Sequence, residues 1–489
     1  FNPLWVFKRK RCGKFKSRLV INGSPGKNSR YAPTLPSTLL HLFISVCAFK
    51  NWDVKSVDIS GAFLHADINN DIYMHPPLGF PLPGMLLKLK KFLYGLKTAP
   101  AAWADLVFNH LKAHGIHQSS YHPCLWYTAN CWIIVFVDDF LIGGSKEEVD
   151  RVAQLILDRF PGTSSKFMDE NGLDYINVTI KKTPTTFTLD QSSYITTKIA
   201  EIVGNQFYPK STPLPTSVSF DDDRSYPTIP FLQQLGALLY VATYTRFDIN
   251  FATSVLAVQA QKATQNAHKC LIRVARYLLA TKDRQLIHHI RTDNTTQFQL
   301  DAFSDVGSPD KTTAKWQTGG IVRANSTPIS WTSRRQKFVV LSTCEGELVA
   351  LCEITKTVLW LRHILTETNL ITGRIPSPIY CDNESAILIG TTDFCNSQRT
   401  RHLQSRWRFT QQHVRKGDIG VFYVSTNFQL ADILTKSFSS EVHNKLLRLI
   451  DTRYVPEQID LLATHAEVKT FLSYSDFTHP DTPGFRFHK

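Results

Sequence analysis

The sequence predicts a mixed α and β protein of the α/β (α+β) class, built from roughly two to four domains. A length of 489 residues exceeds one ordinary domain, and a hydrophobic content of 43% can bury several cores. Apolar runs typical of strands occur on both sides of a middle region whose apolar residues recur at helical spacing. Two strand-rich parts separated by a helical part fit this class.

The excess of basic residues indicates which kind of molecule the protein binds. Basic residues outnumber acidic ones, 55 to 41, and the first 50 residues contain ten Lys or Arg and no Asp or Glu. Such a basic lobe fits a polyanion, most often nucleic acid; a solvated or membrane-surface patch is the alternative.

Nine cysteines without a C-x-x-C pair favour reduced thiols inside a cell. No apolar run reaches about 18 residues, so no membrane span is expected.

Four segments are expected along the chain. Gly, Pro, Ser and Asn mark a loop at residues 22–37, and a second punctuated stretch at residues 209–230 marks a linker. Apolar residues at helical spacing fill residues 231–279, and a strand-rich unit begins near Gln297. The expected segments are residues 1–200, a largely helical part at 201–295, a domain at 296–438, and a tail at 439–489 that is partly disordered. The start at Phe1 rather than Met suggests a piece of a longer protein.

A hairpin with two carboxylates at its turn is predicted for residues 131–144, CWIIVFVDDFLIGG. Adjacent aspartates such as Asp138 and Asp139 repel each other unless a cation lies between them, although a solvated turn is the alternative. Asp58 ends another short apolar strand, and Phe63 follows it, placed to stack under a sugar. Three carboxylates on neighbouring strands could hold two divalent ions about 3.5–4 Å apart, and Mg²⁺ suits carboxylates with phosphates.

A second group of acids follows the linker. A strand at residues 297–306 carries Asp301 and Asp305. Asp382 ends a later apolar strand, and Asp432 lies in the first turns of a predicted helix. An acid at a helix start also favours the helix dipole, so Asp432 alone indicates little.

A third feature of this region is a helix that begins at a capping box. Ser342 and Glu345 form the S-x-x-E pattern, so a helix is expected to start there with Glu347 on its apolar face. A carboxylate on an apolar face is costly unless it is paired or binds a metal. A Glu347 side chain that reaches solvent is the alternative.

Residues 399–416, RTRHLQSRWRFTQQHVRK, form a basic segment without any acid. Basic residues interleaved with an aromatic suit a phosphate backbone and a stacked base, and a solvated helix face is the alternative. The candidate nucleic-acid contacts are Arg399, Arg401, Arg406, Trp407 and Arg408.

Several blocks resemble one protein family. FVDD at residues 136–139 resembles the [YF]-x-D-D motif of reverse transcriptases. Three blocks resemble copia-type long-terminal-repeat retrotransposon polyproteins: VDISGAFLHADINNDIYMHPPLGF, KKFLYGLKTAPAAW and LDQSSYITTKI. Three more resemble the ribonuclease H blocks of that family: WTSRRQKFVVLSTCEGELVAL, IYCDNESAI and NFQLADILTKSF. The blocks keep the family's order, so the chain resembles its reverse transcriptase–RNase H region.

This resemblance implies a right-hand polymerase, with fingers, palm and thumb, followed by a helical connection and a C-terminal RNase H-like domain. Asp58, Asp138 and Asp139 match the polymerase carboxylates. Phe63 matches the residue that excludes a ribose 2′-hydroxyl. The further substrate-binding residues that it implies are Lys14, Lys16, Arg18, Tyr94, Gly95 and Lys97.

The resemblance also implies a second active site and a set of partners. Asp305, Glu347, Asp382 and Asp432 match the four ribonuclease H carboxylates, with Asp305 preferred to Asp301 because F-S-D better fits the family's Y-S-D. Each site would use two Mg²⁺ or Mn²⁺ ions. The implied substrates are RNA template, DNA primer, RNA–DNA hybrid and dNTPs. Integrase and capsid parts of the same polyprotein are implied partners, and the implied location is a cytoplasmic virus-like particle or the nucleus.

Some positions depart from the family's pattern. The loop after Val20 is shorter, and Thr98 and Ala101 replace a Gln and an Arg near the nucleotide. Asn177 replaces a turn Gly, where Asn best tolerates a positive φ, and Gln404 replaces an Asp.

Three alternative functions stay open: an inactive remnant that only binds nucleic acid, a polymerase of another lineage such as a group II intron enzyme, and a plain basic binding module.

Overall fold

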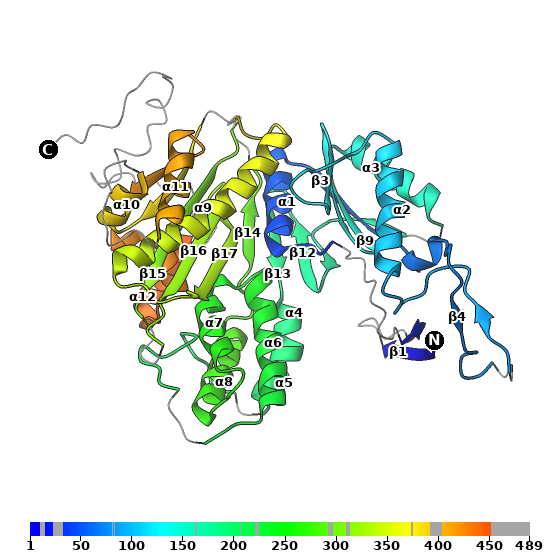
Figure 1. Cartoon of the computed structure of the whole chain (residues 1–489), viewed down its shortest axis with the longest axis horizontal. Helices are drawn as coiled ribbons and strands as arrows, with labels where there is room; N and C mark the ends of the chain where they lie inside the picture. The colour runs from blue at the N-terminus through cyan, green and yellow to red at the C-terminus, as the bar shows by residue number, and fades with distance from the viewer. Residues whose placement is uncertain are drawn as a thin grey trace. The chain divides into compact units, whose positions relative to one another are not determined.

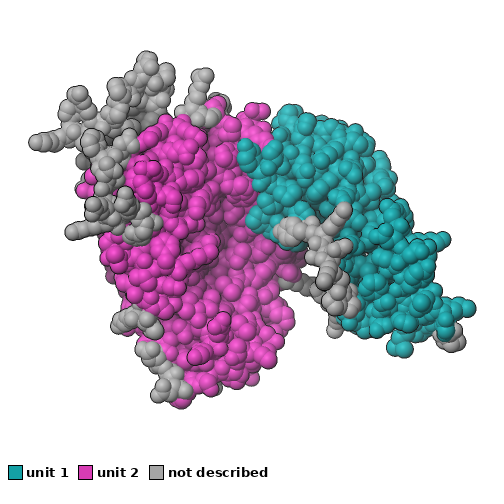
Figure 2. All heavy atoms as spheres, in the orientation of Figure 1, with its two compact units in different colours: residues 1–36, 52–168 teal, residues 37–51, 169–489 magenta. Residues whose placement is uncertain are grey.

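The structure is a computed structural model of the chain (Figure 1). It describes residues 1–9, 15–22, 33–80, 82, 84–161, 164–205, 207–220, 224–291, 297–309, 313–372, 375–391 and 403–450. The chain divides into two compact units, residues 1–36 with 52–168 and residues 37–51 with 169–489 (Figure 2). Each unit has its own sheets and its own hydrophobic core.

The first unit contains a six-stranded antiparallel sheet in the order β10-β3-β9-β8-β7-β6. Its elements are β1 (Pro3–Arg9), β2 (Phe15–Ile21), β3 (Asp53–Asp58), η1 (Ala62–His65), β4 (Tyr73–Met74), β5 (Leu87–Lys88), α2 (Ala99–Ala113), β6 (His117–Gln118), β7 (Leu125–Thr128), β8 (Cys131–Phe136), β9 (Asp139–Gly144), α3 (Lys146–Arg159) and β10 (Ser164–Phe167). Helix α3 packs against β3 and β9. Its N-terminus is capped by Ser145, whose hydroxyl accepts a hydrogen bond from the Glu148 N–H.

The predicted hairpin at residues 131–144 is confirmed as β8 and β9. The two strands pair from Cys131↔Gly144 to Phe136↔Asp139, so residues 137 and 138 form the turn. Nearly all side chains of both strands are buried. The apolar runs on each side of the two aspartates are therefore central strands, as expected for a sheet covered on both faces.

The second unit holds the rest of the described chain. Its elements are α1 (Ser37–Lys50), β11 (Leu173–Tyr175), β12 (Val178–Lys182), β13 (Thr186–Asp190), α4 (Ser192–Tyr194), η2 (Ile195–Ile199), α5 (Ala200–Val203), α6 (Thr228–Tyr244), η3 (Phe247–Ile249), α7 (Asn250–Val258), α8 (Gln265–Ala280), β14 (Leu286–His289), β15 (Leu300–Gly307), β16 (Gln317–Ala324), β17 (Thr327–Arg335), α9 (Thr343–Glu367), β18 (Ser377–Cys381), α10 (Glu384–Thr391), α11 (Gln404–Arg415), β19 (Ile419–Tyr423), η5 (Thr426–Phe428), η6 (Leu430–Leu434) and α12 (Ser440–Ile450). They form one four-stranded sheet, β11-β12-β13-β14, and one five-stranded sheet, β17-β16-β15-β18-β19.

Helix α1 belongs to the second unit although its sequence lies among the first 200 residues. Its residues from Leu39 to Ala48 are all buried, so the helix needs neighbours around its whole circumference. It packs against β13, β14 and β17 of the same unit. The two compact units therefore do not coincide with the four segments that the sequence suggested, and those segments remain a prediction of functional divisions.

The mixed architecture and the main elements of the second unit agree with the expectations. The helical region appears as α6, α7 and α8, which share one core. In the five-stranded sheet, β15, β16 and β17 pair antiparallel, whereas β18 and β19 run parallel to β15 and to each other. Helix α9 begins after Ser342, whose hydroxyl accepts from the Glu345 N–H, so the predicted cap is confirmed.

A tight turn and the last helix among the described residues complete the fold. Ile176 and Asn177 both have positive φ, 52° and 54°, between β11 and β12, so Asn177 does occupy a left-handed position. Helix α12 occupies the start of the expected tail, and residues 451–489 lie outside the described part of the chain. Within the described residues, no helix combines the length and apolar character that a membrane crossing requires.

Candidate active sites

Three carboxylates meet at one edge of the six-stranded sheet and form the first acidic cluster (Asp58, Asp138 and Asp139). Asp58 ends β3 and Asp139 begins β9, and the two residues are direct partners in the antiparallel register. The Ile59 N–H donates to the Asp138 carbonyl oxygen at 3.0 Å, which fixes the turn beside the end of β3. Sheet pairing thus brings together three acids that the sequence separates widely.

The closeness of the three acids in the first acidic cluster affects the pKa of Asp139. Burial, followed by the charges of Asp138 and Asp58, raises the pKa of Asp139 to about 6, against the opposing effect of Lys16. A divalent cation would remove this repulsion, and carboxylate oxygens are the ligands that Mg²⁺ and Mn²⁺ prefer. The donor set therefore fits such ions.

The turn that carries Asp138 has an unusual backbone. Val137 has a φ of 56°, which a β-branched residue rarely adopts. The indole N–H of Trp103, on α2, donates to the Val137 carbonyl oxygen at 2.6 Å and helps to hold this conformation. Strained residues of this kind concentrate at functional sites. The sequence pattern did not point to Val137 or Trp103.

Aromatic and basic side chains lie beside the first acidic cluster. The rings of Phe63 and Tyr94 are 4.4 Å apart, and the Arg18 guanidinium lies 4.9 Å from the centre of the Tyr94 ring. Burial, then the charge of Asp138, raises the pKa of Tyr94. The predicted contacts Arg18, Tyr94 and Phe63 thus gather in one place.

The other residues predicted to bind substrate at this site are Gly95, Lys97 and Lys14, and each has a different environment. Gly95 has a φ of +100°, and a Cβ added to it would overlap the Ile21 carbonyl oxygen. The Ile21 N–H donates to the Tyr94 carbonyl oxygen at 2.7 Å, so Gly95 lets β2 approach this loop. Lys97 is exposed to solvent, and Lys14 lies outside the described residues.

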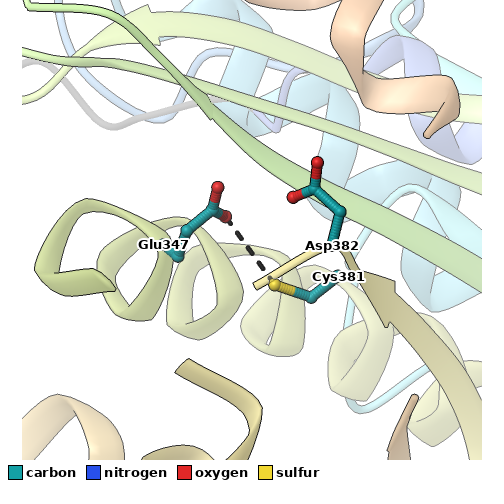
Figure 3. A group of neighbouring side chains, drawn as sticks. All are labelled: Glu347, Cys381 and Asp382. Carbon is teal, nitrogen blue, oxygen red and sulfur yellow. Dashed lines mark hydrogen bonds between the residues drawn. The ribbon is translucent and has the colours of Figure 1, made fainter. Parts of the chain in front are cut away.

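Four more carboxylates form the second acidic cluster (Asp305, Glu347, Asp382 and Asp432), which lies in the second unit. They are supplied by β15, α9, the end of β18 and η6, respectively. Figure 3 shows that the carboxylates of Glu347 and Asp382 face the same space, with the Cys381 thiol beside them. One ligand atom from each of these three residues lies within 4.8 Å of the others.

Asp301 and Asp305 lie on the same strand but have different neighbours. Asp301 forms a two-pronged ion pair with Arg323 on β16, at 2.5 and 3.0 Å. Asp305 is 2% exposed, and the Thr435 hydroxyl donates to its carboxylate. Lys436 lies 3.5 Å from the same carboxylate and 2.7 Å from Asp432. The structure therefore gathers Asp305, not Asp301, with the other acids.

Glu347, Asp382 and Asp432 hold protons more tightly than ordinary carboxyl groups. Burial, followed by the charges of Asp305 and Asp382, raises the pKa of Glu347 to about 9. Burial and the charge of Asp305 raise the pKa of Asp432 to about 7, against the opposing effect of Lys436. Burial likewise raises the pKa of Asp382. Grouped oxygens that carry excess negative charge fit hard divalent cations.

Several residues of this site were not predicted. The Cys381 thiol donates to Glu347 at 3.8 Å, and the Thr426 hydroxyl donates to Asp382 at 2.9 Å. Thr435 and Lys436 lie three and four residues after Asp432, just past the end of η6, a spacing that could have indicated them. Cys381 directly precedes Asp382, but its buried position depends on the packing of α9 against β18.

The predicted basic segment is only partly available to a ligand. Trp407, expected to stack on a base, is 6% exposed and packs in a hydrophobic core with Leu348 and Leu403, so that expectation is corrected. Arg406 pairs with Glu353 at 3.2 Å. Arg408 is exposed to solvent. The remaining candidates, Arg399 and Arg401, lie outside the described residues.

Known proteins resemble this chain over most of its length. Residues 2–216 match the family described as reverse transcriptase (RNA-dependent DNA polymerase). The "Retrovirus-related Pol polyprotein from transposon RE1" of Arabidopsis thaliana is 30% identical over 481 residues, which cover 92% of this chain and 32% of the relative. The corresponding polyprotein from transposon TNT 1-94 of Nicotiana tabacum is 29% identical, with 88% of this chain and 34% of the relative covered.

A more distant relative and a solved structure extend the comparison. The "Transposon Ty1-H Gag-Pol polyprotein" of Saccharomyces cerevisiae is 25% identical over 89% of this chain and 25% of its own length. A prototype foamy virus protease–reverse transcriptase structure aligns with 90% of this chain and 52% of its own, at 12% identity and a TM-score of 0.26. The chain spans about a third of the plant relatives it matches. Residues 2–216 thus match the reverse transcriptase family, and the chain is similar to part of the Pol polyproteins of copia-type retrotransposons.

Proposed function

We propose that this chain copies an RNA template, and then DNA, into DNA, and cleaves the RNA strand of the resulting hybrid. The observation that carries the proposal is the presence of two separate acidic clusters, one in each compact unit. Each cluster is assembled from elements far apart in sequence. A plain basic binding module would need neither, because buried acids weaken the binding of a polyanion.

The first acidic cluster is the proposed polymerase site. Asp58, Asp138 and Asp139 would hold two Mg²⁺ or Mn²⁺ ions, which when bound supply the charge that activates the primer hydroxyl and stabilises the leaving pyrophosphate. Arg18, held over the Tyr94 ring at 4.9 Å, would orient the triphosphate of a dNTP. The basic excess of the first 50 residues would attract the template and primer.

Selection of the sugar is assigned to Phe63. Its side chain is 6% exposed and packs against Tyr94, so it cannot move aside easily. A rigid ring beneath the sugar would collide with a 2′-hydroxyl, and this favours dNTPs over ribonucleotides. The short η1 helix, which begins after Gly61 with a φ of 65°, carries Phe63 against the Tyr94 ring.

The second acidic cluster is the proposed RNase H site. Asp305, Glu347, Asp382 and Asp432 would hold two ions, which when bound generate the attacking hydroxide and stabilise the departing oxygen. Thr435 orients Asp305, and the Thr426 hydroxyl orients Asp382. Because the cluster includes strand, helix and strand-end positions in one fold, its geometry is fixed before substrate binds.

The relatives suggest the wider context of the chain. They are polyproteins about three times as long as the matched region, and integrase and capsid parts of such a polyprotein are the proposed partners. A virus-like particle in the cytoplasm, or the nucleus, is the proposed location. In this context the RNA–DNA hybrid made by the first site is the substrate of the second.

Primer extension tests the proposed polymerase. Asp138→Asn should lower extension of a DNA primer on RNA at least roughly 100-fold, because one metal ligand is lost while the fold is kept. Asp158→Asn, the same change on the exposed face of α3, should extend normally. Wild-type protein that extends no primer with Mg²⁺ or Mn²⁺, yet still binds the hybrid, would favour the inactive remnant.

A further inference from the structure

Lys436 lies inside the second acidic cluster and contacts two of its acids. Its ammonium nitrogen is 2.7 Å from a carboxylate oxygen of Asp432 and 3.5 Å from one of Asp305. Those two side chains are only 8% and 2% exposed. The backbone N–H of Lys436 also donates to the Asp432 carbonyl oxygen at 3.1 Å, so the side chain starts from a fixed point.

We propose that Lys436 is a resident cation, which holds Asp305 and Asp432 together when no metal is bound and is displaced when a divalent ion binds between them. The inference rests on the proposed nuclease function for the identity of the ion. It makes Lys436 a positioning residue that sets how tightly this half of the site binds metal.

The charges of the cluster require a balancing cation. Two carboxylates buried this close together are unfavourable unless a positive group lies beside them. Lys436 is the basic residue that forms ion pairs with both Asp305 and Asp432 among the described residues. A divalent ion bound to those two acids would use the same oxygen atoms and would repel the ammonium group at a short distance. Both cations cannot stay in place.

The Lys436 side chain can move toward solvent when a divalent ion displaces it. Lys436 is 35% exposed and has a flexible stem, so it can swing away without unfolding η6. It also borders a small pocket lined by Thr212, Phe438 and His443. The Thr435 hydroxyl keeps its hydrogen bond to Asp305, so that acid stays oriented while the ammonium leaves.

Metal binding without substrate tests this proposal. Lys436→Gln should melt at a lower temperature than wild type in EDTA, because the two acids lose their counter-charge. The same variant should bind Mn²⁺ roughly tenfold more tightly in calorimetry, because no ammonium competes. Lys356→Gln is the matched control, since Lys356 pairs with Glu353 at 2.9 Å on the exposed side of α9. It should change neither quantity appreciably.

The outcomes separate this inference from the nuclease proposal. Unchanged or weaker Mn²⁺ binding by Lys436→Gln would overturn displacement, even if wild-type protein cleaves RNA. The expected gain in affinity without any cleavage by wild type would overturn the nuclease proposal and support the role of Lys436. A wild-type protein that binds no Mn²⁺ would overturn both.

Discussion

A buried acid such as Glu347 is tolerated only where something balances its charge. It is 2% exposed, and its carboxylate accepts hydrogen bonds from the Val306 N–H and the Cys381 thiol. These neutral donors do not cancel a full negative charge. In the absence of metal the group therefore binds a proton, and this gives the protein a measurable dependence on pH.

Metal-free protein should lose stability as the pH rises from 7 to 9, the interval between the pKa values of Asp432 and Glu347. Both folded-state values lie above the ordinary 3.8 and 4.5, so the folded chain holds more protons than the unfolded chain, and unfolding becomes easier as they leave. Melting temperatures in EDTA measure this slope.

Two comparisons check that prediction. Mg²⁺ should flatten the slope, because the ion replaces the protons, and Glu347→Gln should flatten it in EDTA, because one titrating group is removed. A melting temperature that rises with pH over this interval, or an equal slope in the variant, would contradict the proposed charge balance.

Between neighbouring elements, the first site depends on how closely β2 approaches the loop that carries Tyr94. Gly95 makes this approach possible, because any larger residue would collide with the Ile21 backbone. Arg18 lies on β2, so its position over the Tyr94 ring follows from the same contact. The binding of the nucleotide thus depends on a backbone contact between two segments.

Gly95→Ala should raise the KM for dNTP by on the order of tenfold or more, since misplacing a binding group by about 1 Å can cost roughly 100-fold. Steady-state primer extension measures it. Gly115→Ala is the matched control, because Gly115 also has a positive φ, +72°, but nothing lies within 4 Å of the added Cβ. An equal effect of both substitutions would show that conformational strain alone, and not the contact with β2, matters.

The sequence predicted those elements whose shape depends on local patterns. Paired apolar runs around Asp138 predicted the hairpin of β8 and β9, and the capping box at Ser342 predicted the start of α9. Features that depend on distant neighbours escaped prediction. The basic segment predicted that Trp407 stacks on a base, yet the helix that carries Trp407 packs against α9 and α10 and buries it. The sequence pattern did not single out Lys436, whose place beside Asp305 depends on the fold.

At the scale of the whole molecule, the two acidic clusters belong to different compact units. Each unit positions its acids through its own sheet and core, so loss of one site need not disturb the other. The family match supports the proposed site of the first unit more directly than that of the second, because it covers residues 2–216. The proposed RNase H site is supported mainly by the geometry of its acids. A variant that loses RNA cleavage but keeps primer extension tests this site.

Glu347→Gln should reduce cleavage of the RNA strand at least roughly 100-fold and leave primer extension within about twofold of wild type. Release of labelled RNA fragments and growth of a labelled primer, measured on the same hybrid, give both values. Glu201→Gln, which breaks only the exposed pair with Lys198, should retain both activities. Loss of extension together with cleavage would mean that the two sites are not independent.

The central claim is that the chain builds two separate sites for divalent cations. Anomalous diffraction from crystals soaked in Mn²⁺ tests it most directly. Anomalous peaks are expected between Asp58 and Asp139 and between Glu347 and Asp382. Peaks at only one of these places, or only at surface acids elsewhere, would contradict it.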